Sequence, residues 1–459
     1  MVKTQTLNNP LGNERIGKLL AQYAIPSIIS LIINSLYNMV DQIFIGQGVG
    51  FLGNGATNII APITMIAIAV GSLFGDGLAS FFSLHLGKGE PEKAAQSLGN
   101  AIVVSATISI LLTVGSLLFL SPLCNIFGAT ENIMPYALGY GRIIVIGFPA
   151  VITSTAINAA IRTDGSPRFA MLSMMIGAVL NTILDPIFIF CFHWGVEGAA
   201  LATVLSQYVG LACNAMYLFR MKTVHLKRSS FFVEIPIAAR IASLGFASCF
   251  NNLTSTIVSM VSNNLLTKYG EMSVYGPDIP ITTFGLCMKV SMIAFSIGIG
   301  VASGSQPILG FNYGAQKYDR VRKTFIASVS VCSVITLLSW VVFQCFPLQL
   351  IRIFGTESQL YEEFAVQCFR IYLMLTFLNG LQMCTGVLFQ AIGQPIKAAV
   401  ASLSKQLLFY IPAMLICSRI GGLTGILAAG PTADVLAFIL CSALCFREMK
   451  RMKIFVISK

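Results

Sequence analysis

Long apolar stretches recur along the chain, and each is long enough to cross the hydrocarbon core of a membrane as a helix. Six fall at about residues 18–44, 55–85, 95–120, 134–160, 168–192 and 197–220. Six more fall at about 236–266, 280–310, 322–346, 360–391, 397–418 and 423–446. Strands of a membrane barrel would alternate between apolar and polar side chains, which these continuous runs do not. The pattern predicts an all-α polytopic membrane protein with twelve transmembrane helices.

Three short motifs repeat with nearly the same offset, which indicates that the chain consists of two related halves. The letters IFG occur at 126–128 and again at 353–355, and GSP at 165–167 is matched by GQP at 393–395. LGKGEPEK at 86–93 resembles FNYGAQKY at 311–318. Each half holds six apolar stretches, so the two copies share one orientation and are related by a pseudo-twofold axis along the membrane normal. We expect an amino-terminal six-helix lobe at 1–220, a linker at 221–235, and a carboxyl-terminal lobe with a basic tail at 236–459.

Composition agrees with a membrane protein and argues against nucleic-acid binding. Hydrophobic residues make up 56% of the chain and charged residues only 10%, too few to cover a soluble protein of 459 residues. The net charge is +11, but the basic residues lie in short connections rather than in one tract interleaved with aromatic residues. Cysteines fall mostly inside apolar runs, and the three histidines are scattered, so neither a disulfide framework nor a metal-binding motif is predicted. We expect no cofactor.

The distribution of lysine and arginine predicts the orientation of the chain in the membrane. Most of them fall in connections that would share one side, at 3–18, 88–93, 162–168, 220–228, 317–323 and 447–459. The positive-inside rule then places both termini in the cytoplasm. Residues 1–14 are polar and the first apolar run is too long for a signal peptide, so no cleaved leader is expected. The lipid bilayer of the cytoplasmic (inner) membrane is the predicted location.

The first apolar stretch carries four polar residues on one stripe of a helix. Asn34, Tyr37, Asn38 and Asp41 are spaced i, i+3, i+4 and i+7. A carboxylate in hydrocarbon costs several kcal/mol or more, so Asp41 should face protein or water. Pro26 cannot donate a backbone hydrogen bond to the carbonyl of Gln22. A bend is therefore predicted in the helix before the polar stripe. The stripe is either a polar seam that packs against another helix or the working part of a helix that moves.

A second polar group lies in the fifth and sixth stretches. Asn181 and Asp185 are i and i+4 and share one helix face, and Pro186 frees the carbonyl of Thr182. These oxygens, with the hydroxyl of Thr203, could bind sodium, and the carboxylate could equally hold a proton. The alternative is that Asn181 and Asp185 only brace a kinked helix. In the second half the equivalent Ile411-Pro412 keeps the proline without the acid, so ion binding is expected in the first half.

Other intramembrane residues remain open to more than one interpretation. Asp76 lies in a run of small residues, and Asp434 follows a proline; both are either structural or functional. Lys289 could pair with an acid or extend to the membrane surface. Met288 and Met292 beside it are adaptable side chains that suit a promiscuous substrate cavity, although such residues more often serve packing.

Several motifs together resemble the multidrug and toxic compound extrusion (MATE) family. They are the first helix from Pro26 to Asp41, GKGEPEKA at 87–94, DGSP at 164–167, NTILDP at 181–186 and QPILGFNYGA at 306–315. The chain is most similar to the prokaryotic branch whose cation site lies in the amino-terminal lobe. The resemblance assigns cation coupling to Asp41, Asn181, Asp185 and Thr203. It also assigns the kink to Pro26 and cavity positions to Tyr37 and Asn158.

The resemblance implies a monomeric antiporter rather than an enzyme. Such a protein expels amphipathic, often cationic drugs while sodium or protons run inward, and alternating access exposes the site to each side of the membrane. The predicted substrate cavity comprises Asn34, Tyr37, Asn38, Asn158, Met288 and Met292, with helix kinks at Pro26 and Pro186. Two transport alternatives are a lipid-linked oligosaccharide flippase, which would need a strongly basic cavity, and an exporter of an endogenous metabolite. A membrane enzyme would need a catalytic cluster, and His85, His193 and His225 are far apart in sequence.

Overall fold

The fold is built from helices, and its layout follows the apolar stretches of the sequence. A computed structural model describes residues 9–354 and 358–457, and no strand occurs within these two ranges. The short α2 (Pro10–Asn13) precedes the first long helix. The amino lobe then contains α3 (Ile16–Gly48), α4 (Phe51–Gly87), α5 (Pro91–Leu118), α6 (Leu120–Ile126), α7 (Met134–Ile146), α8 (Phe148–Thr163), α9 (Pro167–Pro186), the π-helix η1 (Ile187–Cys191) and α10 (Gly195–Leu218).

The second lobe follows a segment that contains the 3-10 turn η2 (Arg228–Phe231). Its elements are α11 (Ile235–Glu271), α12 (Asp278–Gly314), α13 (Tyr318–Cys345), α14 (Pro347–Phe354), α15 (Gln359–Gln367), η3 (Cys368–Tyr372), η4 (Thr376–Leu378), α16 (Asn379–Ala391), α17 (Pro395–Leu403), η5 (Ser404–Tyr410) and α18 (Ile411–Ile457). Two of them, η3 and η5, are π-helices, which widen the helix by one residue per turn. Both π-helices lie inside membrane-spanning stretches.

Nine helices in the described ranges are long and apolar enough to cross a membrane, or ten if α7 and α8, bent by 41° at their junction, form one span. One of the nine is the 58-residue stretch Pro395–Met452, which crosses twice because the backbone breaks at Gly422 (φ 56°, ψ −130°). The remaining span is α11. It is long enough to cross a membrane, but its Asn and Ser residues lower its hydropathy, so it is not among the nine helices. The twelve-helix prediction is confirmed, and three of the spans are not resolved by a hydropathy count of single helices: the α7–α8 pair, the second crossing within Pro395–Met452, and α11.

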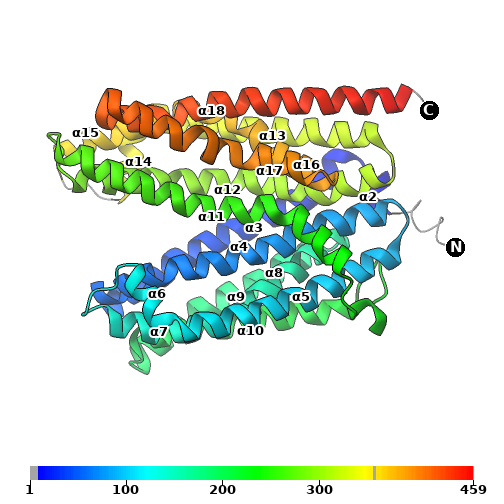
Figure 1. The fold of residues 1–459 in the computed structure, drawn as a ribbon, viewed down its shortest axis with the longest axis horizontal. Coiled ribbons are helices and arrows are strands. Elements are labelled where there is room, and N and C mark those ends of the chain that lie inside the picture. Colours follow the sequence, from blue (N-terminus) through cyan, green and yellow to red (C-terminus); the bar gives the residue numbers. More distant parts are fainter. Residues whose placement is uncertain (1–8, 355–357, 458–459) are drawn as a thin grey trace.

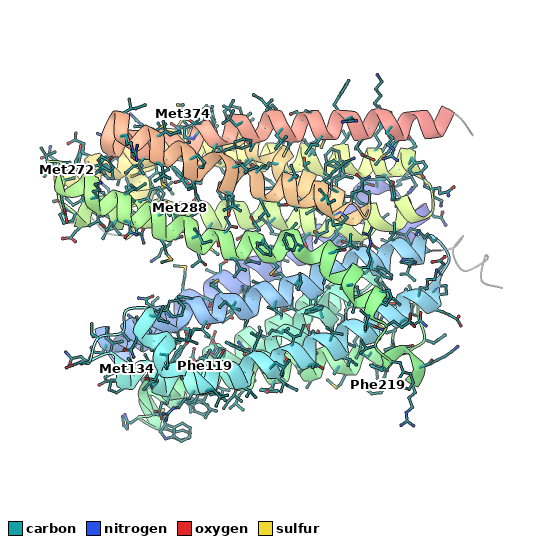
Figure 2. All side chains as sticks on the ribbon, in the orientation of Figure 1. Phe119, Met134, Phe219, Met272, Met288 and Met374 are labelled. Atoms are coloured by element: carbon teal, nitrogen blue, oxygen red, sulfur yellow. The ribbon has the colours of Figure 1, made fainter. Side chains whose placement is uncertain are left out.

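The two lobes touch at one end of the molecule and diverge toward the other (Figure 1). The described chain begins and ends near the closed end, which we call the terminal end. Figure 2 shows Met134 of the amino lobe and Met272 of the carboxyl lobe at the opposite, separated end. Large apolar side chains such as Leu111, Leu118 and Ile439 are exposed on the outer surface, as a lipid-facing protein requires.

Glycines without side chains allow the lobes to meet backbone to backbone. A Cβ at Gly245 of α11 would lie 1.7 Å from the carbonyl oxygen of Leu73 in α4, and one at Gly314 would lie 2.1 Å from that of Leu84. In a membrane, helix interfaces are enriched in small residues, which let the backbones of neighbouring helices approach closely. A buried apolar cluster reinforces the contact, because it joins Phe82 of α4 to Phe311 of α12. The terminal end is therefore tightly sealed.

Candidate ion and substrate site

A cavity of about 840 Å³ lies between the lobes, and both lobes contribute its walls. Residues of α3, α4, α8, α9 and α10 line one side, and residues of α11, α12, α16, η5 and α18 line the other. This volume falls in the range that holds drug-sized ligands. Its lining mixes amide and hydroxyl side chains with methionines and aromatic residues, which suits ligands of varied shape.

The predicted pairing of Asn181 with Asp185 is present in α9. The side-chain amide of Asn181 donates to Oδ1 of Asp185 at 3.1 Å, one helical turn away. The same nitrogen donates to Oγ1 of Thr203 in α10 at 3.2 Å. Thus the three residues that the sequence pattern grouped are in direct contact. Asn181 and Thr203 line the cavity, while Asp185 is fully buried one layer behind.

Asp41 of α3 meets this group from a second helix. Its side chain is 8% exposed and lies close enough to interact directly with the carboxyl group of Asp185. Neither acid forms an ion pair with a lysine, arginine or histidine among the residues that the structure describes. Oδ1 of Asp41, Oδ1 of Asn181 and Oδ2 of Asp185 are buried and have no hydrogen-bond partner. Unpaired buried oxygens are costly, and carboxylate and amide oxygens of this kind are able to accept a proton or coordinate a small cation.

Two tyrosines stand beside the acid pair. Tyr37 of α3 lines the cavity, and Tyr140 of α7 is buried; both lie within electrostatic range of Asp41 and Asp185. Tyr37 belongs to the stripe that the sequence identified. Tyr140 was not predicted, because nothing in the spacing of its own helix points toward two acids on other helices.

The residues predicted for the substrate cavity are placed in two groups. Asn34, Tyr37, Asn158 and Met288 line the cavity. Asn38 and Met292 are not among its lining residues: Asn38 is exposed and donates to the carbonyl of Asn34 at 2.6 Å, and Met292 is 62% exposed. The amide of Asn158 donates to the carbonyl of Ala170 at 2.9 Å, which fixes the side chain between α8 and α9.

The two predicted kink prolines lie at different kinds of position. Pro26 lies inside α3, which continues through it as one helix, and it lines the cavity. The hydroxyl of Ser30 donates to the carbonyl of Pro26 at 2.8 Å. Pro186 is the last residue of α9, and the π-helix η1 begins at the next residue, so the backbone hydrogen-bond register changes just after Asp185.

A charged group that the sequence placed elsewhere lies where the lobes meet. Arg162 was assigned to a connection between spans, but α8 extends to Thr163 and brings it to the cavity beside Asp76. Its Nη1 donates to Oγ of Ser303 in the carboxyl lobe at 2.7 Å. Gln306 of the same lobe donates to the carbonyl of Asp76 at 3.2 Å. Asp76 and Arg162 therefore belong to a polar seam that joins the lobes.

The carboxyl lobe carries an ion pair on its own cavity wall. Nζ of Lys405 lies 2.6 Å from Oδ1 of Asp434 and donates to Oδ1 of Asn379 at 2.8 Å. All three residues line the cavity. Asp434 was noted from the sequence, but its pairing with Lys405 depends on how η5 packs against α18. Lys289, in contrast, is exposed and does not line the cavity.

Known proteins share both the sequence pattern and the fold. The FAD transporter of Shewanella oneidensis is 24% identical over 446 residues, which covers 95% of this chain and 96% of that protein. The multidrug export protein MepA of Staphylococcus saprophyticus is 23% identical over 418 residues, covering 90% and 89%. A solved structure described as the outward-facing conformation of a multidrug resistance MATE family transporter of the MOP superfamily superposes with a TM-score of 0.89. It is 23% identical and covers 98% of both chains.

The family assignment rests on a match that extends through both lobes. The sequence model described as MatE matches residues 26–187 and 247–416, which include the polar stripe of α3, the Asn181–Asp185 pair and most of the cavity wall. The resemblance drawn from the sequence motifs is thereby confirmed. This chain belongs to the MATE family of multidrug efflux transporters.

Proposed function

We propose that the protein is a secondary antiporter that expels amphipathic, often cationic small molecules in exchange for sodium or protons. The observation that supports this most directly is the group of unpaired oxygens on Asp41, Asn181 and Asp185. Asn181 itself lines the cavity, and the two buried acids lie behind the wall that it forms with Tyr37 and Thr203. An inward-moving cation bound there would share α3 and α9 with a substrate in the cavity.

Coupling follows if the ion and the substrate favour different arrangements of the same helices. An ion between Asp41 and Asp185 draws α3 toward α9, because both carboxylates must approach it. A substrate that contacts Asn34 and Tyr37 occupies the same helix from the cavity side. A ligand shifts a conformational equilibrium only by the difference between its affinities for the two states. Pro26, which deprives α3 of one backbone hydrogen bond, lowers the cost of changing that helix.

The proposed setting is the cytoplasmic membrane, with both termini in the cytoplasm and the cavity of a single chain acting as the transport unit. The positive-inside distribution supports the orientation, and the enclosure of the cavity by the two lobes of one chain supports a monomer. In this orientation the terminal end is the cytoplasmic end, so the structure represents the arrangement open to the outside.

A second candidate is the export of an endogenous metabolite. The FAD transporter of Shewanella oneidensis matches this chain over 95% of its length, so a protein named for transport of a metabolite is among the relatives. A flippase for lipid-linked oligosaccharide is less favoured, because the two basic residues of the cavity wall, Arg162 and Lys405, each lie beside an acid. A diphosphate headgroup carries several negative charges and would require a cluster of basic residues, which the described residues of this wall do not supply.

The proposal is tested by transport in proteoliposomes with sodium and pH gradients imposed separately. Asp41→Asn and Asp185→Asn should each reduce gradient-driven efflux of a fluorescent cationic dye at least about tenfold. Asp278→Asn is the matched control, since Asp278 is exposed in the first turn of α12. Purified amount and melting temperature show that each variant is folded. Wild-type efflux rates in both acid variants would rule out the proposed coupling site.

A further inference from the structure

The carboxyl lobe presents one basic side chain to the cavity from an irregular stretch of helix. Lys405 lies in the π-helix η5 (Ser404–Tyr410), and Lys405, Gln406 and Tyr410 all line the cavity. π-helical turns inside longer helices are unfavourable on their own and occur frequently at functional sites. The position of Lys405 is thus maintained at a structural cost.

The ammonium of Lys405 has bonding capacity left for a ligand. A lysine offers three N–H donors. In the structure Nζ donates to Oδ1 of Asn379 and lies 2.6 Å from Oδ1 of Asp434, so at least one N–H remains for a ligand. The side chain of Lys405 is 27% exposed while that of Asp434 is 5% exposed. A ligand in the cavity therefore meets the ammonium before it meets the carboxylate.

Corresponding helices of the two lobes differ in charge, because the amino lobe carries an acid without a basic partner among the described residues and the carboxyl lobe carries an ion pair. In the amino lobe, the fifth and sixth spans supply Asp185 and Thr203 without a basic partner. In the carboxyl lobe, the eleventh and twelfth spans supply Lys405 and Asp434, whose charges balance. Because Lys405 is the more exposed of that pair, the wall opposite the acids is polarised toward positive charge. The cavity is bipolar rather than uniformly acidic.

Arg162, the second basic residue of the cavity wall, already contacts residues of both lobes. Nη1 of Arg162 bonds to Ser303 of the opposite lobe, and its guanidinium lies beside Asp76. A ligand that took over Arg162 would break a contact between the lobes. All the partners of Lys405 belong to its own lobe, so a ligand can bind it without disturbing the seam.

We propose that Lys405 is a recognition point for an acidic group, a carboxylate or a phosphate, on molecules that enter the cavity. The inference rests on the proposed function in taking the cavity as the substrate site, and it extends the substrate class from cations to zwitterions and anions. Asp434 acts as an internal competitor that neutralises Lys405 when no acidic ligand is bound. An incoming acid takes a free N–H of the ammonium and weakens the ion pair with Asp434, because a hydrogen bond between two charged groups is stronger than one between neutral groups.

Two pairs of fluorescent probes isolate the acidic group. Rhodamine 110 carries a free carboxylate, and rhodamine 123 is its methyl ester; riboflavin 5′-phosphate and riboflavin differ by a phosphate. Binding to purified protein in nanodiscs is measured by fluorescence anisotropy without any ion gradient. Lys405→Met should raise the Kd of at least one acidic probe about tenfold and change the Kd of its neutralised partner less than about threefold. The arm that responds identifies carboxylate or phosphate as the preferred group.

The reverse change distinguishes recognition from a structural role. Asp434→Asn removes the internal competitor and should lower the Kd of the acidic probe several-fold, a gain that damage to the fold does not produce. The double variant Lys405→Met/Asp434→Asn contains no unpaired buried charge and should bind acidic probes as weakly as Lys405→Met alone.

Three results would overturn the proposal: equal changes for both members of each probe pair, weaker binding of acidic probes to Asp434→Asn, or no binding of either acidic probe to the wild type. Binding without a gradient does not depend on ion coupling. Failure of the antiport proposal at Asp41 and Asp185 is therefore distinguishable from failure here.

Discussion

The side-chain nitrogen of Asn181 lies 3.1 Å from Oδ1 of Asp185, one turn further along α9. This bond fixes one oxygen of the carboxylate and leaves the other, Oδ2, buried without a partner. The amide oxygen of Asn181 is also unpaired. Asn181 thus orients Asp185 and at the same time offers an oxygen of its own, so the pair forms an incomplete site rather than a closed hydrogen-bond network.

Replacement of Asn181 should weaken ion binding more than replacement of Thr203. Asn181→Leu removes both the amide donor that orients Asp185 and an oxygen that could bind the ion. Thr203→Val replaces one hydroxyl by a methyl group of similar volume. We expect the ion concentration for half-maximal efflux to rise about tenfold in the first variant and about threefold in the second. Efflux from proteoliposomes, titrated separately with sodium and with protons, measures both. Unchanged half-maximal concentrations for Asn181→Leu would contradict a role in ion binding.

A methyl group at Gly245 should loosen the contact between the lobes. The added Cβ would lie 1.7 Å from the carbonyl oxygen of Leu73, and a backbone atom has little freedom to yield. We expect Gly245→Ala to cost about 1–3 kcal/mol and to lower the melting temperature of the purified protein by several degrees. Gly285→Ala in α12 is the matched control, because no atom lies within 4 Å of its added Cβ. Equal melting temperatures for the two variants would show that the lobes adjust freely.

The pH dependence of stability should contain a small contribution from Glu90, which lies between α4 and α5. The hydrogen bond from His85, at 2.6 Å, holds the pKa of Glu90 below its usual value, and Lys93 at 3.3 Å adds to the effect. A lowered pKa in the folded state stabilises the protein above the unfolded carboxyl pKa and ceases to do so as the pH falls through the folded value. Because the side chain is 38% exposed, the effect is small.

Glu90→Gln should therefore lower the melting temperature by about 1 °C at pH 7, and the difference should vanish as the pH falls through the lowered pKa of Glu90 in the folded protein. Glu92→Gln serves as the control, since Glu92 is 86% exposed and its ion pair is with the exposed Lys227, at 3.4 Å. A difference between Glu90→Gln and the wild type that grows toward acid pH would reverse the expected sign and refute the assignment.

Single-helix geometry explains what the sequence could predict, and packing between helices explains what it could not. Asn181 and Asp185 meet because residues four apart share a face, which the letters alone reveal. Asn34, Tyr37 and Asn38 were grouped by the same rule, but a stripe spaced i, i+3 and i+4 is about 100° wide. Tyr37 and Asn38 lie at opposite edges of it, and only the Tyr37 edge lines the cavity.

The bond between Arg162 and Ser303 and the pair of Lys405 with Asp434 join residues 141 and 29 positions apart on different helices. No periodicity within one helix encodes such a contact. Arg162 was misplaced because α8 continues about one turn beyond the predicted end of the span. The residue therefore lies in the cavity wall rather than in a connection.

Ser303→Ala should favour separation of the lobes at the terminal end. Nη1 of Arg162 donates to Ser303 at 2.7 Å only while the lobes touch, so the variant leaves the guanidinium under-bonded in this arrangement alone. Losing such a partner costs about 1–3 kcal/mol, which shifts a two-state equilibrium about fivefold or more.

Hydrogen–deuterium exchange detects that shift in peptides spanning 84–89 and 311–315, where Gly87 and Gly314 seal the lobes backbone to backbone. We expect faster exchange there in Ser303→Ala and wild-type exchange in Ser255→Ala, whose hydroxyl also lines the cavity but bonds only to Asn252 of its own helix. Removing a bond that stabilises only the state with touching lobes must lower the population of that state. If both serine variants exchange like the wild type, the Arg162–Ser303 bond therefore does not help to hold the lobes together.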